Sequence, residues 1–285
     1  MKRLLAAALL FLAGCAKGPE PLRVGSKPFT ESEIVGEMIA LLAEADGVPV
    51  ERRFFLGGSV CFEALKKGDL DAYVEYSGTG LVNLLGEPPQ SDAGKVFERV
   101  KDEFARRWGL SWAAPLGFNN SYALMVRGEQ ARKEGLARIS DLKKNRYLCG
   151  FDLEFADRPD GWKGLKAAYG LDACRELRQM NSGLLYDALA QGSVDLISGY
   201  STDGRIKTLG LAVLDDERRF FPPYQAAPLL GPHALAKAPK LAGRLAALAG
   251  RLSDEEMRAL NAQVDSGKRP AREVARDFLK SKGLL

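Results

Sequence analysis

Short runs of strand-forming residues alternate with helical segments along most of this 285-residue chain. The pattern starts near Leu22 and repeats after Tyr122. The expected strands are 22–25, 51–56, 70–75, 121–127, 147–151 and 194–200. Strands that alternate with helices of this length build α/β units around largely parallel sheets.

The segment after the first strand carries clear helix signals. Thr30 and Glu33 have the spacing of a capping box, so we expect Thr30 to be the N-cap. Gly47 is expected to end this helix. The apolar residues that recur at helical spacing and form its buried face are Ile34, Met38, Ile39, Leu41 and Leu42.

The last stretch, 237–282, has a helical pattern almost throughout. Ser253 and Asp254 can cap one helix there, and Pro270 can open the next. Such helices at the end of the chain can cover the sheet formed by its beginning.

The two groups of strands predict two α/β lobes. We place lobe I at 22–123 plus 220–285 and lobe II at 124–219. The chain then crosses twice between the lobes. A ligand cleft beside these crossings is the expected binding site.

The N-terminus has the features of an export signal. Lys2 and Arg3 precede an apolar run of about ten residues, 4–13, which is too short to span a bilayer as a helix. The run ends in Leu-Ala-Gly-Cys, which resembles the bacterial lipobox cleaved before a lipid-modified cysteine, here Cys15. We therefore expect a leader at 1–15, a tether at 16–21, and an extracytoplasmic protein anchored by lipid. The alternative is an uncleaved N-terminal anchor.

The charge of the chain and its cysteines argue against two kinds of site, one for nucleic acid and one for a metal ion. Without Lys2 and Arg3 the chain has 39 basic and 37 acidic residues, about +2 by subtraction, and no long basic run, which argues against nucleic acid. Besides Cys15 there are three cysteines. Outside the cytoplasm a disulfide between Cys149 and Cys174 can form. Because three is an odd number, one thiol then stays unpaired, and with this pairing it is Cys61. Neither their spacing nor a nearby histidine indicates a metal site.

No catalytic motif supports an enzyme. The chain lacks Gly-x-Ser-x-Gly, His-Glu-x-x-His, a phosphate loop and a dinucleotide fingerprint. Its one histidine, His233, stands in a Gly-Pro-His sequence that is typical of a surface turn.

Six loops combine glycine, proline, aromatic and charged residues at the ends of regular elements, where α/β proteins bind ligands. They are 26–31, 75–79, 119–122, 154–161, 200–203 and 221–224. Four of them contain a tyrosine, and any one of these tyrosines alone could be a half-buried packing residue.

In this order, the loops resemble those of the glycine betaine/proline betaine-binding proteins of bacterial and archaeal osmoprotectant importers. The resemblance runs from about Arg23 to the C-terminus and includes four further segments, 56–58, 123–127, 185–189 and 202–205. It implies a two-lobe fold of the type II periplasmic-binding-protein kind with the ligand cleft between the lobes. It also implies a monomer without cofactor or catalysis that serves the membrane subunits of an ABC importer.

The resemblance assigns roles by matching motif. The box for a trimethylammonium head would be Tyr76, Tyr122, Tyr200 and Tyr224. Its carboxylate tail would be held by Lys27, Thr79 and Arg158. Two cations favour a ligand with an anionic group, so we expect glycine betaine or proline betaine rather than choline. Some relatives in this family bind choline, carnitine or ergothioneine, so these solutes are the alternatives.

This chain departs from the family at Ser77, where the family often has threonine, and Asn119 and Asn120 lie where the family varies. A ligand-sensing module or an enzyme on the same architecture is a second class of function, and a structural lipoprotein a third. The leader argues against an intracellular enzyme. A structural lipoprotein would leave the four tyrosines and two cations unexplained.

Overall fold

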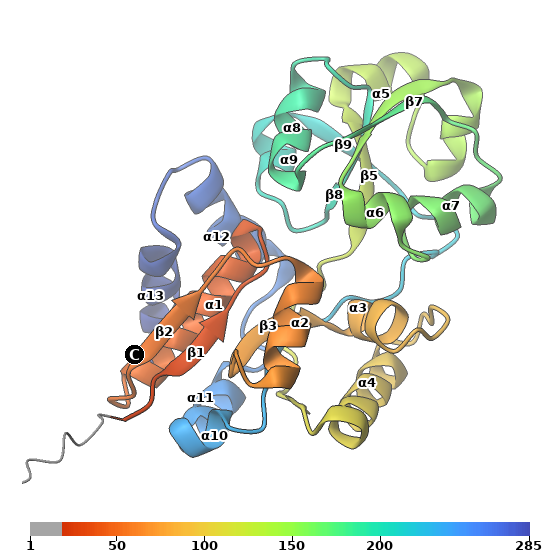
Figure 1. Cartoon of the computed structure of the whole chain (residues 1–285). Coiled ribbons are helices and arrows are strands. Elements are labelled where there is room, and N and C mark those ends of the chain that lie inside the picture. The colour runs from red at the N-terminus through yellow and green to blue at the C-terminus, as the bar shows by residue number, and fades with distance from the viewer. Residues whose placement is uncertain (1–18) are drawn as a thin grey trace, which may run out of the picture.

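The computed structural model describes residues 19–285 and has two lobes, each built around one five-stranded sheet (Figure 1). The predicted leader with Cys15, and residues 16–18 of the tether, lie outside the described residues. Within 19–285, no helix is both long and apolar enough to span a bilayer. The strands are β1 (Leu22–Gly25), β2 (Val50–Arg53), β3 (Ala72–Tyr76), β4 (Ser111–Trp112), β5 (Tyr122–Arg127), β6 (Tyr147–Phe151), β7 (Cys174–Gln179), β8 (Leu196–Tyr200), β9 (Leu211–Leu214) and β10 (Ala226–Leu230).

Both sheets follow the same plan. The first has the order β2-β1-β3-β10-β4, and the second β7-β6-β8-β5-β9. In each, three parallel strands adjoin one antiparallel strand, β10 or β5, which directly follows a crossing between the lobes. These two strands begin where their parallel neighbours end, since Ala226 pairs with Tyr76 and Tyr122 with Tyr200. Loops from both sheets therefore meet at one place, the cleft.

The helices pack around these sheets, and the C-terminal helices α12 and α13 lie against α1 (Figure 1). All five predicted apolar-face residues of the first helix are buried. The helices are α1 (Thr30–Glu44), α2 (Gly58–Lys67), α3 (Ser77–Thr79), the π-helical turn η1 (Gly80–Leu84), α4 (Ala93–Trp108), α5 (Gly128–Glu134), the 3-10 helix η2 (Ile139–Lys144), α6 (Leu153–Asp157), α7 (Trp162–Tyr169), α8 (Ser182–Ala190), α9 (Arg205–Thr208), α10 (Ala234–Lys237), α11 (Leu241–Leu248), α12 (Asp254–Asp265) and α13 (Ala271–Ser281).

The predicted start of α1 is wrong by one residue. Phe29 is the N-cap and Thr30 is already helical, so the Thr30 hydroxyl is free to donate to Asp265 on α12 at 2.5 Å. The helix ends at Glu44, and Gly47, with φ of 78°, forms the turn that leads to β2. Other predicted ends are confirmed: Ser253 forms a capping box with Glu256 at the start of α12, and Pro270 immediately precedes α13.

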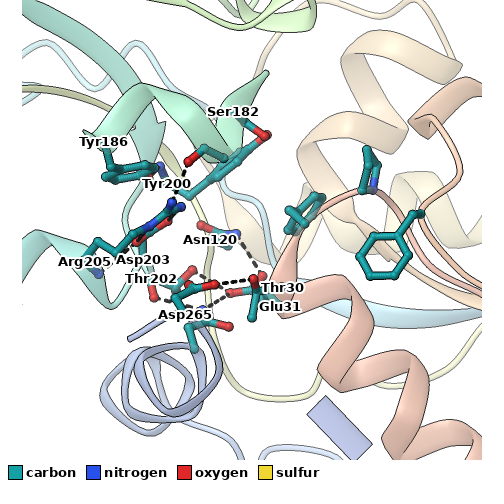
Figure 2. Close-up of a pocket in the computed structure, with 15 residues that line it drawn as sticks. Thr30, Glu31, Asn120, Ser182, Tyr186, Tyr200, Thr202, Asp203, Arg205 and Asp265 are labelled. Carbon is teal, nitrogen blue, oxygen red and sulfur yellow. Dashed lines mark hydrogen bonds and ion pairs between the residues drawn. The ribbon is translucent and has the colours of Figure 1, made fainter. Parts of the chain in front are cut away.

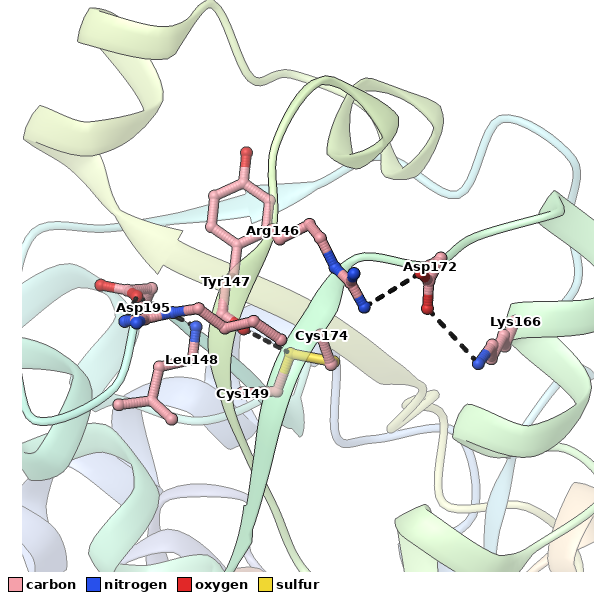
Figure 3. Close-up of a disulfide and its surroundings, with 9 residues drawn as sticks. Arg146, Tyr147, Leu148, Cys149, Lys166, Asp172, Cys174 and Asp195 are labelled. Carbon is pink, nitrogen blue, oxygen red and sulfur yellow. Dashed lines mark hydrogen bonds and ion pairs between the residues drawn. A yellow bond between two sulfur atoms is a disulfide. The ribbon is translucent and has the colours of Figure 1, made fainter.

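Cys149 and Cys174 form a disulfide between the neighbouring strands β6 and β7, with Cα atoms 5.6 Å apart (Figure 3). Beside it, Arg146 and Lys166 face Asp172 at 3.0 and 3.7 Å. The structure therefore contains the Cys149–Cys174 pair that the sequence left open. Cys61 is a buried free thiol.

The two crossings lie side by side, because Asn119 and Gln225 form an isolated antiparallel bridge. The exact lobe limits, 22–123 plus 220–285 and 124–219, stay a prediction. His233 lies exposed at the start of α10, as its turn sequence predicts.

Candidate functional site

All seven residues predicted to contact a ligand line a single cavity between the lobes. Three others join them. The lining is Lys27, Phe29, Tyr76, Thr79, Asn120, Tyr122, Glu154, Arg158, Tyr200 and Tyr224. The free volume is about 30 Å³, and two larger cavities of about 170 and 520 Å³ adjoin it.

The fold brings these side chains together because they follow strand ends that meet at the cleft. From lobe I, Lys27 follows β1 and Tyr76 ends β3. From lobe II, Tyr200 ends β8 and Arg158 directly follows α6. Tyr122 opens β5 directly after the first crossing. No single lobe therefore completes the cavity.

The tyrosine rings contact one another closely. Tyr122 stacks on Tyr200, with ring centroids 5.5 Å apart and planes at 29°, and meets Tyr224 edge-on at 5.6 Å and 88°. Burial raises the pKa of all four cavity tyrosines well above the ordinary value, so their hydroxyls stay protonated at neutral pH. The walls are neutral, polarisable ring faces and edges.

Arg158 is held by a buried carboxylate. Its Nε and Nη2 donate to Asp160 at 2.7 and 2.6 Å, and the Tyr224 hydroxyl donates to the same Asp160 at 2.7 Å. Across the cleft, Nη2 also reaches Thr79 Oγ1 at 3.4 Å. The guanidinium lies 5.4 Å from the Tyr122 ring centroid. Asp160 thus uses one edge of the guanidinium, which leaves Nη1 available to a ligand.

Lys27 also has a buried partner. Its Nζ donates to Glu75 Oε1 at 2.5 Å and lies 5.2 Å from the centroid of Tyr76. Glu75 accepts two more hydrogen bonds, from the Tyr73 hydroxyl and the Tyr76 amide. Lys27 therefore already neutralises a carboxylate that is fully buried.

A further buried carboxylate, Glu31 at the start of α1, joins the lobes beside the cavity (Figure 2). Its oxygens accept from the side chains of Tyr76 at 2.7 Å, Asn120 at 2.8 Å, Thr202 at 2.5 Å and Asn261 at 3.5 Å. Burial raises its pKa to about 7, although these hydrogen bonds act in the opposite direction. One Glu31 oxygen therefore holds the Tyr76 hydroxyl, and the other accepts from Thr202 of lobe II.

Phe29, Asn120 and Glu154 were not among the predicted site residues, although each lies in one of the six loops selected from the sequence. Phe29 is not one of the four tyrosines that the resemblance assigns to the box. Glu154 is exposed at the cavity rim, and within 19–285 its carboxylate has no ion-pair partner. Across the same range, no group of three or more histidine, cysteine or acidic residues could hold a metal ion.

Residues 20–281 match the family described as the substrate binding domain of ABC-type glycine betaine transport system. The chain is 38% identical over 293 residues to the glycine-betaine-binding protein of Pseudomonas aeruginosa, covering 99% of this chain and 94% of that protein. It is 36% identical over 285 residues to the ergothioneine transport permease/ergothioneine binding protein EgtU of Helicobacter pylori. That match covers 99% of this chain but 51% of the relative, so the chain spans about half the length of this relative.

Among solved structures, the chain resembles the crystal structure of a glycine betaine/carnitine/choline ABC transporter. The TM-score is 0.76 at 35% identity, over 92% of this chain and 99% of the other. This likeness confirms the mixed α/β, two-lobe fold of type II periplasmic binding proteins.

Proposed function

Because this chain belongs to the family of substrate-binding domains of ABC-type glycine betaine transport systems, we propose that it captures glycine betaine or proline betaine for an ABC importer. The observation that carries the proposal is the convergence of four tyrosines and two cations, from both lobes, on one cavity. Carnitine, choline and ergothioneine are alternative solutes, because the names of similar proteins include them.

The tyrosines suit a quaternary ammonium head. Such a head has no N–H to donate, so hydrogen-bond acceptors cannot select it. Aromatic faces attract it through the ring quadrupole, by about 0.5–2 kcal/mol per desolvated contact. Tyr76, Tyr122, Tyr200 and Tyr224 are proposed to form this box.

The tail site needs donors, and the proposal assigns them to Arg158, Thr79 and Lys27. Arg158 is the strongest of the three, because Asp160 fixes its orientation and leaves Nη1 free for a carboxylate. The Thr79 hydroxyl lies beside the guanidinium. Lys27 contributes positive potential, although Glu75 already balances its charge.

Export and delivery complete the proposal. Cleavage before Cys15 and lipidation there would tether the protein outside the cytoplasm, close to the membrane subunits of its importer. The chain would act as a monomer that binds and releases its solute without chemical change. Metabolic labelling with a radioactive fatty acid tests this part, and an unlabelled Cys15 would refute the anchor.

Calorimetric titration of the protein without residues 1–15 tests the ligand. We expect saturable binding of glycine betaine and weaker binding of choline under the same conditions, because choline has no carboxylate for Arg158. If neither ligand binds, the substrate is a different solute and the aromatic box is wrong.

Substitution of Arg158 tests the tail assignment separately. Arg158→Ala should weaken glycine betaine binding by about tenfold or more, since a hydrogen bond to a charged group contributes about 1.5–3 kcal/mol. Choline binding should change much less. An equal loss for both ligands would show that Arg158 holds the site together rather than the tail.

A further inference from the structure

Phe29 and Tyr200 form the partition between the ligand cavity and its two neighbours. They are the two residues that line all three cavities. Their rings stack with centroids 5.3 Å apart and planes at 25°. Since Phe29 directly precedes α1 in lobe I and Tyr200 ends β8 in lobe II, this stack is a contact between the lobes.

The stack leaves Tyr200 little surface for a ligand. Tyr200 contacts two rings in stacked geometry, Phe29 at 5.3 Å and Tyr122 at 5.5 Å. A cation must come within about 6 Å of a ring centroid, over its face, to interact with it. The remaining free volume of about 30 Å³ has room for little more than a water molecule. A trimethylammonium group therefore cannot reach the face of Tyr200 that Phe29 covers while Phe29 stays there.

The backbone of Phe29 is fixed, but its ring has space to move. The Phe29 amide donates to the Lys27 carbonyl at 2.9 Å, and the Phe29 carbonyl accepts from the Glu33 amide at 3.2 Å. The side chain is only half-buried and borders the cavity of about 520 Å³. A change of side-chain rotamer can move the ring off Tyr200 without moving α1.

We propose that Phe29 is a specificity-determining gate. With the lobes closed and no ligand bound, its ring covers Tyr200, and it swings away when the ligand's ammonium head is held between the lobes. The space that it vacates limits the size of the head that the site accepts. This inference rests on the proposed function, because it assumes that the ligand carries a quaternary ammonium group.

Two zwitterions that differ only in head size test the gate: glycine betaine and its triethylammonium analogue. The variants are Phe29→Ala and Phe29→Leu, which keeps apolar volume but removes the stacking ring. Phe55→Ala is the matched control, because Phe55 lines the 170 Å³ cavity, is 59% exposed and stacks on no ring among the described residues. We expect both Phe29 variants to shift the affinity ratio toward the triethyl analogue by about two- to tenfold, the value of one aromatic contact. Phe55→Ala should leave the ratio unchanged.

An unchanged ratio in the Phe29 variants, or an equal loss of affinity for both zwitterions, would overturn the proposal, because Phe29 would then not limit the size of the head. A second measurement needs no ligand: fluorine NMR of the protein with 4-fluorophenylalanine at position 29. We expect exchange between two environments in the free protein, and a single rigid environment would also overturn the proposal. Failure of the wild type to bind either zwitterion would instead count against the proposed function, with the NMR result still deciding whether Phe29 moves.

Discussion

Arg158, the residue proposed to hold the ligand's tail, depends on a partner of its own. Asp160 accepts from its Nε and Nη2, and the two side chains are 5% and 0% exposed. In such a site the pair itself adds little net stability, but removing one partner leaves a buried charge without compensation. The orientation of Arg158 is therefore tied to folding as well as to binding.

Asp160→Asn should lower the free energy of unfolding by about 3 kcal/mol, because it leaves the Arg158 guanidinium buried without a counter-charge. Asp157→Asn is the matched control. Asp157 is exposed on the neighbouring helix α6, and its substitution should change stability by no more than about 0.5 kcal/mol. Urea unfolding at pH 7 measures both, and equal stabilities would show that Asp160 is dispensable for Arg158.

Glu31 should give the protein an unusual dependence of stability on pH. Its pKa rises from an ordinary 4.5 to about 7 on folding, so between these values the folded state binds a proton that the unfolded state has lost. The stabilising contribution is complete below pH 4.5 and is lost as the pH rises through 7. A shift of this size corresponds to a loss on the order of 3 kcal/mol.

Glu31→Gln removes this titration. We expect the difference in unfolding free energy between wild type and variant to fall as the pH rises from about 4.5 to 7, and to be flat above that. Taking the difference cancels the other carboxylates, such as Glu103, whose pKa is lowered to about 2. Glu273→Gln, on an exposed position of α13, is the control and should parallel the wild type. A difference that stays flat between pH 4.5 and 7 would mean that Glu31 is already charged over this range in the folded protein.

The sequence predicts the residues that face the cavity better than the residues that hold them there. Tyr76 and Arg158 belong to recognisable motifs, and the structure brings them together. Glu31 lies in loop 26–31, which was selected from the sequence, but it was given no role, because its partners Thr202 and Asn261 lie 171 and 230 positions away. Contacts at such separations depend on the packing of the lobes, which no local pattern encodes.

Among the elements, strands with an apolar pattern were predictable and four others were not. β7 has the sequence Cys-Arg-Glu-Leu-Arg-Gln and is mostly exposed at the edge of its sheet, so it lacks an apolar signal. β10 contains Pro228, which argues against an interior strand, yet it lies between β3 and β4. β4 has two residues, too few for a period to be recognised, and β9 was not predicted although it is as long as β1.

The disulfide should stabilise the edge strand β7, whose side chains contribute little to a core. Replacing Cys149 and Cys174 together by alanine should lower the free energy of unfolding by about 3 kcal/mol, since the bond closes a loop of 25 residues. Glycine betaine affinity should be unchanged, because neither cysteine lines the cavity. Cys61→Ala is the control and should respond to reductant as the wild type does. Reductant that leaves wild-type stability unaltered would show that the bond is absent in solution.

At the scale of the whole molecule, several side-chain contacts cross the cleft near the cavity. They include Arg158 to Thr79 at 3.4 Å, Thr202 to Glu31 at 2.5 Å and the stack of Phe29 on Tyr200. Two crossings joined by a short β-bridge connect the lobes. Such a connection lets two rigid bodies rotate about a hinge.

A ligand that contacts both lobes must shift the hinge toward the closed form, because only that form offers it all of its partners. Small-angle scattering should therefore show a smaller radius of gyration when glycine betaine is added at saturating concentration. Arg158→Ala, at a ligand concentration high enough to fill the site, should compact less, since it removes a contact from lobe II while Lys27 and Tyr76 of lobe I remain. Saturation of the wild type without compaction would refute closure and leave a rigid, preformed site. In that case, residues from both lobes would be needed only to form the site. The division into two lobes would then have no role in releasing the ligand to the importer.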